Sequence, residues 1–245
     1  MSEIAVRVNP VVGARNGFFF AAHCALLAVV FVGFGRTFYL RAFFDTGPLP
    51  AQLYVHGAIL TLWFSFAVVQ AWLIRSRQLR RHRRVGYAAA TYAAAVVVSG
   101  MVVNSHLAAT LASPADAENI IVWGNYLTLL MFALFVGLGV LLRKRAEAHK
   151  RLMLLASVAI VGPALGRFPL WPIFAGGLDA ARNYAIGGLL LLLVSLIVYD
   201  IVTRRRPHPA TWLGAIAIFG SLAVSVALGV TGTGFVILQR LFHGA

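Results

Sequence analysis

Long apolar runs separated by short polar segments dominate the sequence between residues 17 and 241. Each run is about 20 residues or longer, which is the length that an α-helix needs to cross the hydrocarbon core of a bilayer. Because the last run contains Gly229, Gly232 and Gly234, we expect it to break or end near Thr231. The pattern predicts an all-α bundle of seven transmembrane helices over roughly 17–40, 51–74, 85–110, 119–142, 149–171, 182–203 and 209–241.

The composition agrees with this prediction. Of the 245 residues, 60% are hydrophobic and only 11% are charged, whereas about 25% of the residues in an ordinary globular domain are charged. A net charge of +14 would indicate nucleic-acid binding in a soluble protein, but here the cations lie in short loops between apolar runs. We therefore expect residues 1–245 to form a single transmembrane domain that contacts the lipid bilayer and binds no nucleic acid. Cys24 is the only cysteine, so no intrachain disulfide and no cysteine-based metal site can form.

Basic residues gather in every second loop of the predicted bundle. Three stretches, RSRQLRRHRRVG at 75–86, RKRAEAHKRLM at 143–153 and RRRPHPATWLG at 204–214, hold 14 arginines and lysines between them, while the opposite loops hold only Arg36, Arg41 and Arg182. The positive-inside rule then places the N-terminus in the cytoplasm and the C-terminus outside, in a bacterial inner membrane. Each stretch runs from basic residues through a histidine into a new helix, which fits one helix followed by three related hairpins.

Polar side chains near the outer ends of the runs form a first candidate site, because such groups are costly within a membrane and usually serve a function. His56 and His106 lie at matching depths in the second and third runs, when depth is counted at about 1.5 Å per residue. Further polar residues fall in the same outer quarter: Arg36, Asn104, Asn125, Tyr126 and Arg167.

Two interpretations of this outer cluster remain open. In the first, His56 and His106 bind a metal, a haem iron or a polar ligand head, while Arg167 or Arg36 pairs with an anionic group. In the second, His56 makes a hydrogen bond to a neighbouring helix and His106 faces the outer membrane interface.

A second candidate site lies at the inner ends, where His82 and His149 begin the third and fifth helices. Imidazole binds haem iron or metals through one nitrogen, while a hydrogen bond to the other nitrogen fixes its tautomer. Two histidines at equal depth could hold a haem between them. The alternative is that both are interfacial residues within arginine runs at the level of the lipid headgroups.

Four stretches carry a resemblance that covers nearly the whole chain: PLPAQLYVHGAILTLWFSFAVVQ, HRRVG, AHKRLMLLASVAIVGPALGRFP and HPATWLG. With these stretches the chain resembles a family of uncharacterised bacterial seven-helix integral membrane proteins. A weaker resemblance, to the ascorbate-reducible di-haem cytochromes b and to membrane proteins of haem-copper oxidase assembly, rests on His56 followed by glycine, on Gln70, and on His82 in HRRVG.

The di-haem resemblance implies which histidines would pair. In that family four successive helices each supply one histidine, and helices two apart in sequence share a haem. His82 and His149 satisfy one such pair. His56 would need a histidine on the fourth helix, which offers only Asn119, Trp123 and Asn125, so a second haem would have to use His106 and break the family pattern.

Two functions remain open on the sequence alone. The first is a membrane redox protein that transfers electrons, with haem b bound by His82 and His149, with His56 and His106 as further candidate ligands, and with a quinone as a candidate partner. The second is a non-catalytic membrane protein that aids the assembly of a respiratory complex, or that binds a lipid-like ligand through the outer cluster. Whether the chain is an enzyme stays open, although no phosphate loop, nucleophile elbow or HExxH motif occurs in it.

Overall fold

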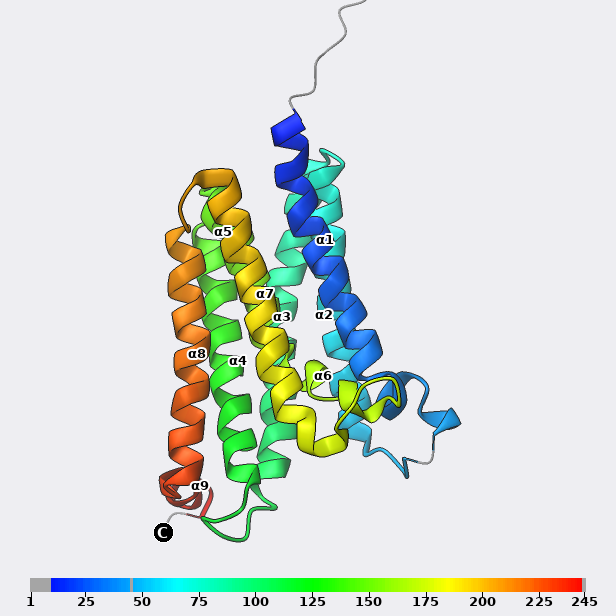
Figure 1. The fold of residues 1–245 in the computed structure, drawn as a ribbon, viewed down its shortest axis with the longest axis vertical. Coiled ribbons are helices and arrows are strands. Elements are labelled where there is room, and N and C mark those ends of the chain that lie inside the picture. Colours follow the sequence, from blue (N-terminus) through cyan, green and yellow to red (C-terminus); the bar gives the residue numbers. More distant parts are fainter. Residues whose placement is uncertain (1–9, 45, 244–245) are drawn as a thin grey trace, which may run out of the picture.

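The computed structural model describes residues 10–44 and 46–243, with side chains described for 17–44 and 46–241, and over these residues the regular structure is entirely helical. The α-helices are α1 (Pro10–Gly33), α2 (Ala51–Arg75), α3 (Leu79–Ala108), α4 (Glu118–Leu141), α5 (Ala146–Ala159), α6 (Gly162–Leu165), α7 (Ala181–Arg204), α8 (Pro209–Val230) and α9 (Thr233–His243). The long helices α1 to α5, α7 and α8 run up and down the bundle (Figure 1). A short π-helical turn, Gly35–Tyr39, follows α1, and 3₁₀ turns occur at Arg41–Phe43, Phe168–Leu170 and Gly177–Ala180.

The bundle has the helices of a multi-pass membrane protein. Within the described residues, 5 helical segments are long and apolar enough to cross a membrane: α2, α3, α4, the segment Gly177–Arg204, and α8. The pair α5 and α6 makes a sixth if it is counted as one bent span, and α1 contributes a shorter apolar segment, Gly17–Gly33.

The three basic stretches lie at one end of the bundle, which we call the basic end and define by the turns at residues 75–79, 142–145 and 204–208. All three turns are at the top of Figure 1, where α1 also begins, whereas α9 lies at the opposite end. The alternation of basic and non-basic loops in the sequence is therefore a real segregation of charge in space.

Helix α5 lies in the middle of the bundle, and this explains its composition. Nine of its 14 residues are buried, on every side of the helix, and it packs against α4, α8, α1 and α7. Seven of these nine residues are apolar, as expected for a helix surrounded by other helices, and Arg151 and Ser157 are the buried polar exceptions.

The predicted fifth span, 149–171, is wrong as a single straight helix. The chain bends by 47° between Ala159 and Gly162, because Pro163 follows Gly162 and cannot donate a backbone hydrogen bond to a continuing helix. The new turn, α6, packs against α1 at Gly33, where a Cβ atom would collide with the Ala164 carbonyl group. The bend thus places α6 against α1, and Arg167 follows shortly after it.

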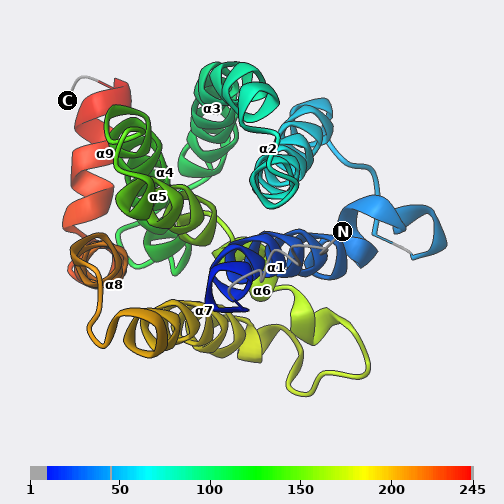
Figure 2. The same ribbon diagram turned by 90° about the horizontal axis from the view of Figure 1, so that it is seen from above.

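The expected break of the last run near Thr231 is confirmed. Helix α8 ends at Val230, and α9 begins at Thr233 after Gly232, which adopts a φ of +69° that favours glycine. Seen along the bundle, α9 lies across the end of α4 and α8 rather than continuing the line of α8 (Figure 2).

A buried ion pair, which we call the α5–α7 latch, joins three helices at the basic end. The side chains of Arg151 on α5 and Asp200 on α7 are both 0% exposed. Arg151 Nε donates to Asp200 Oδ1 at 2.9 Å, and Arg151 Nη2 bonds the same oxygen. Asp200 Oδ2 accepts from the His208 backbone N–H at 2.9 Å and from Thr211 Oγ1 at 2.6 Å, which attaches α8.

The latch corrects a local interpretation of the sequence. Spacing along α7 suggests an (i, i+4) pair between Asp200 and Arg204. Instead, Arg204 Nη1 lies 3.6 Å from a carboxylate oxygen of Glu147. Glu147 also accepts from Arg151 Nη1 at 2.7 Å. The charges therefore form one network across α5 and α7.

His208 begins α8 as its N-cap, since its Nδ1 accepts from the Ala210 backbone N–H at 3.0 Å. Burial, then the nearby Arg151 and Arg204 guanidinium groups, lower the pKa of His208 from its ordinary 6.5, although Asp200 and Glu147 act in the opposite direction. Because the pKa is lower in the folded state, the stability contributed by neutral His208 is complete above about pH 6.5 and falls as the pH drops through that value.

We therefore expect the thermal unfolding midpoint in detergent to fall between about pH 7.5 and about pH 5.5, and to fall less in His208→Asn. Asparagine keeps an oxygen for the cap but does not titrate. An equal fall in both proteins would show that His208 does not carry the pH dependence, and His106→Asn, at an exposed position, is the matched control.

Candidate functional site

The structure brings the imidazole rings of His82 on α3 and His149 on α5 together at the basic end. Their ring centroids are 6.2 Å apart, and the ring planes make an angle of 86°. Nδ1 of His149 lies 2.8 Å from the carbonyl oxygen of Gly139, and Nδ1 of His82 lies 3.3 Å from that of Gln70. Since a carbonyl oxygen can only accept, the contact of His149 favours a proton on its Nδ1 and leaves its Nε2 with a lone pair.

The side chain of Gln70 is a second contact of His82. With its amide nitrogen toward His82, Gln70 donates to the His82 carbonyl oxygen at 3.1 Å and to Nδ1 at 2.6 Å, while its amide oxygen accepts from the Gly86 backbone N–H at 3.0 Å. The contact with Nδ1 requires that nitrogen to be unprotonated and so favours the His82 proton on Nε2. For His82 to bind a metal through Nε2, the amide must turn so that its oxygen accepts from Nδ1–H.

The separation of the two ring centroids is close to that of two imidazole ligands on opposite sides of one iron. An imidazole nitrogen binds a metal at about 2 Å and the ring centroid lies roughly 1.2 Å further out, so two axial rings have centroids about 6.4 Å apart. Exposed arginines at 81, 83 and 84 flank His82, and they suit the carboxylates of a haem. Among the described residues no group of three or more His, Cys, Asp or Glu side chains is placed to hold a metal ion.

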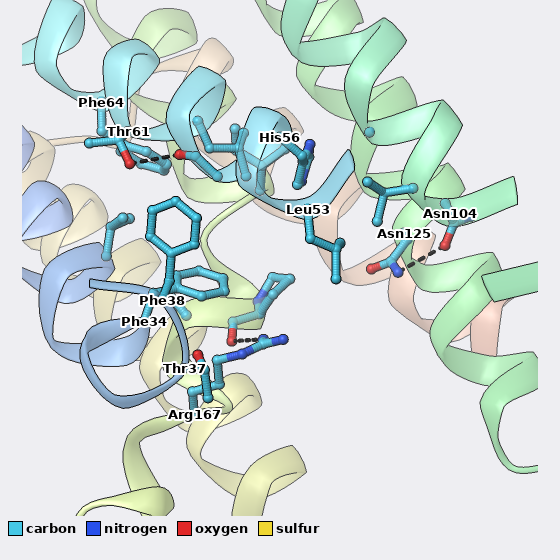
Figure 3. Close-up of a pocket in the computed structure, with 18 of the residues that line it drawn as sticks. Phe34, Thr37, Phe38, Leu53, His56, Thr61, Phe64, Asn104, Asn125 and Arg167 are labelled. Atoms are coloured by element: carbon cyan, nitrogen blue, oxygen red, sulfur yellow. Dashed lines mark hydrogen bonds between the residues drawn. The ribbon is translucent and has the colours of Figure 1, made fainter. Parts of the chain in front are cut away.

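The outer candidate residues surround a cavity of about 250 Å³ near the opposite end of the bundle, which we call the outer cavity. Helices α1 to α4, the Gly35–Tyr39 turn and the bent segment after α5 all contribute to its wall. His56, Asn104, Asn125 and Arg167 line it, and Figure 3 shows them around a largely apolar space.

Hydrogen bonds to neighbouring helices orient the polar side chains of the outer cavity. His56 Nδ1 lies 3.0 Å from Ser99 Oγ. Asn104 donates to the Val122 carbonyl oxygen at 3.0 Å, and Asn125 donates to Asn104 Oδ1 at 2.9 Å. Asn104 is fixed between α3 and α4, and it holds Asn125 in turn. One amide N–H and the Oδ1 of Asn125 make no hydrogen bond to other described residues.

Arg167 reaches the outer cavity because of the bend after α5. Its Nη1 donates to the Pro163 carbonyl oxygen at 2.8 Å, and its guanidinium lies 4.5 Å from the ring centroid of Phe34. No described carboxylate lies within ion-pair distance of it, since the four ion pairs of the described residues involve other cations.

Three predicted outer residues do not line the cavity. The Tyr126 hydroxyl lies 3.2 Å from Ser105 Oγ. His106 is exposed, and its Nδ1 lies 2.8 Å from the Val102 carbonyl oxygen of its own helix. Arg36 bonds the Leu170 carbonyl oxygen and lies 4.6 Å from the centroid of Phe44, so it holds the chain after α6 in place. The structure therefore does not bring His106 to His56, and the second haem site that would need this pair is not formed.

Three polar residues near the two sites were not assigned a role on the sequence. Thr37 lines the outer cavity with a buried hydroxyl that has no described partner. His23 is buried on the same face of α1 as Phe19 and Leu26, and its Nδ1 has no described partner. Trp63, 2% exposed, donates to Ser157 Oγ at 3.2 Å. The spacing of residues 19, 23 and 26 is a helical signal that could have placed His23 on the inner face of its helix.

Comparison of the chain with known protein families, curated proteins and solved structures finds no match. The function proposed below depends on the residues and geometry of this chain.

Proposed function

We propose that this protein is a seven-span bacterial inner-membrane protein that transfers electrons and binds one haem b between His82 and His149. The observation that carries the proposal is the pair of imidazole rings, whose centroids lie 6.2 Å apart with each Nδ1 next to a backbone carbonyl oxygen. A histidine that serves as a metal ligand usually donates its other ring N–H to such an acceptor.

The topology in this proposal has the basic end in the cytoplasm. The cations of the three basic turns would then follow the positive-inside rule, and the N-terminus would be cytoplasmic and the C-terminus outside. Seven spans, counted as α1, α2, α3, α4, the bent segment from α5, α7 and α8, agree with termini at opposite ends. The three basic turns, each entering a new helix, support an origin from repeated hairpins.

The chain's own residues would set the properties of the haem site. When bound, a haem supplies one-electron redox chemistry at its iron. The Gly139 and Gln70 carbonyl oxygens orient the rings of His149 and His82, and hydrogen bonds to Nδ1 raise the basicity of such ligands. The arginines beside His82 would pair with the propionates, and Gln70 would adjust the tautomer of His82.

The alternative left by the sequence, a non-catalytic assembly or ligand-binding protein, has one observation in its favour. The outer cavity, largely apolar with a few polar side chains, has the character of a site for a small amphipathic molecule, and it does not depend on a haem. No contact in the structure favours a role in the assembly of a respiratory complex.

The experiment is an absorption spectrum of the detergent-purified protein, produced with a haem precursor, before and after reduction with dithionite. We expect a Soret band that sharpens on reduction, with about one haem per chain, and we expect His82→Ala, His149→Ala to abolish it. His106→Ala, at the exposed position, is the matched control and should keep the spectrum. A colourless wild-type protein, or an unchanged band in the double variant, would reject the haem site.

A further inference from the structure

We infer that the outer cavity binds the ring of a lipophilic quinone. The redox role of a bound quinone rests on the proposed electron-transfer function, whereas quinone binding itself depends only on the cavity. The occupant is defined by four features of the cavity wall: where its polar groups lie, which of them lack partners, what its apolar surface consists of, and how much space it encloses.

The polar groups lie on two sides of the outer cavity. Figure 3 shows Thr37 and Arg167 on one side and His56 and Asn125 on the other, with Phe38 and Leu53 between them. A ligand that satisfies both sides needs hydrogen-bond acceptors at two opposite edges. A quinone ring has a carbonyl oxygen at each of two opposite positions, whereas a fatty acid has its polar atoms at a single end.

Two of these groups have donors that no described acceptor uses. The Thr37 hydroxyl is buried and unpartnered among the described residues, and a buried polar group without a hydrogen bond is costly. One guanidinium nitrogen of Arg167 donates to the Pro163 carbonyl oxygen, and Arg167 has no described carboxylate partner. A carbonyl oxygen that gains negative charge on reduction would be the natural acceptor for a guanidinium in an apolar wall.

Aromatic and aliphatic side chains make up the rest of the wall. Phe34, Phe38 and Phe64 line the outer cavity together with Leu53 and Leu60. Flat rings stack on aromatic faces, and aliphatic side chains accept an isoprenoid tail. A space of about 250 Å³ suits a head group of one or two rings, at the small end of ligand pockets, and not a porphyrin.

The outer cavity and the histidine pair are connected through α2. His56 and Gln70 are both on α2, 14 residues apart, which is about 21 Å along a helix. Trp63 lies midway between them and makes an edge contact with Phe132, with ring centroids 4.7 Å apart. The proposed quinone would therefore lie toward the end of the bundle opposite the proposed haem, with buried aromatic side chains between the two sites.

The test is a binding titration of the full chain in detergent with decylubiquinone and, in parallel, menadione, followed by quenching of tryptophan fluorescence. We expect saturable binding of at least one quinone, weakened about tenfold or more by Arg167→Gln, which removes the charged donor, and by Asn125→Val, which removes the amide donor. His106→Gln, outside the cavity, should bind as the wild type does.

Further measurements keep the test decisive. If Arg167→Gln does not fold, Thr37→Val, which removes only a hydroxyl, should still weaken binding several-fold. Equal binding by wild-type and cavity variants, or no saturable binding of either quinone, would overturn the inference. Palmitate that competes with the quinone at equal affinity would assign the cavity to acyl chains and would also overturn it.

The titration is repeated with His82→Ala, His149→Ala, which should bind quinone as the wild type does. Quinone binding without any haem in the wild-type protein would leave the cavity site standing and reject the electron-transfer function. Haem in the wild-type protein without quinone binding would reject the quinone site and leave the proposed haem site in place.

Discussion

Asp200→Ala is expected to lower the free energy of unfolding by about 3–5 kcal/mol, the largest effect of any single substitution that we predict. The alanine leaves the Arg151 guanidinium, 0% exposed, without its buried counter-charge. It also removes the acceptor for the His208 backbone N–H and for the Thr211 hydroxyl. Helices α5, α7 and α8 would lose their shared attachment at the basic end.

The measurement is unfolding by sodium dodecyl sulfate in mixed micelles, compared with Glu147→Gln as the control. The Glu147 side chain is 48% exposed, so its loss should cost less than about 1 kcal/mol. Replacing both members of the pair, Arg151→Met with Asp200→Leu, should recover most of the lost stability, because an apolar pair leaves no unpaired charge. If Asp200→Ala were as stable as Glu147→Gln, the latch would not be a stabilising contact.

His149→Gly is expected to convert the proposed haem from six-coordinate to five-coordinate, with His82 as the remaining protein ligand. Because the ring of His149 is held by the Gly139 carbonyl oxygen and not by another side chain, its removal leaves a space of the size of imidazole. Added imidazole should enter that space and restore the six-coordinate spectrum, as a ligand of the same chemistry.

The measurement is a titration of the His149→Gly protein with imidazole, followed by the Soret band. His106→Ala should be six-coordinate without imidazole and should not respond to it. An unchanged spectrum in His149→Gly, or one that imidazole does not alter, would exclude His149 as a ligand.

The sequence predicts the helices well because a helix in a membrane needs a long apolar run and its ends need polar residues or proline. The break near Thr231 is confirmed for the same reason, as three glycines weaken the helix there. The bend in the fifth span was not predicted. Gly162 and Pro163 are a local signal for a helix end. The apolar run around them nevertheless has the length of a full span, so a shorter helix buried in the middle of the bundle has the same sequence pattern as a straight transmembrane helix.

The long-range contacts could be predicted only in part. Depth along the helices brought His82 and His149, and also His56, Asn104, Asn125 and Arg167, to common levels. Depth says nothing about direction around a helix. His106 follows Asn104 by two residues, about 200° around α3, so the burial of Asn104 (2% exposed) turns His106 outward.

The Asp200 partner was missed for a related reason. Arg204 is near Asp200 in sequence, whereas Arg151 is brought to it only by the packing of α5 against α7. A single sequence gives the local pair and not the distant one.

The most direct test of the proposed haem site is the low-temperature electron paramagnetic resonance spectrum of the oxidised, purified protein. The planes of His82 and His149 are 86° apart, and nearly perpendicular axial imidazoles give low-spin ferric haem a strongly anisotropic signal. We predict that signal, at about one haem per chain. A high-spin signal, the rhombic signal of parallel rings, or a protein without haem iron would contradict the site built by these two histidines.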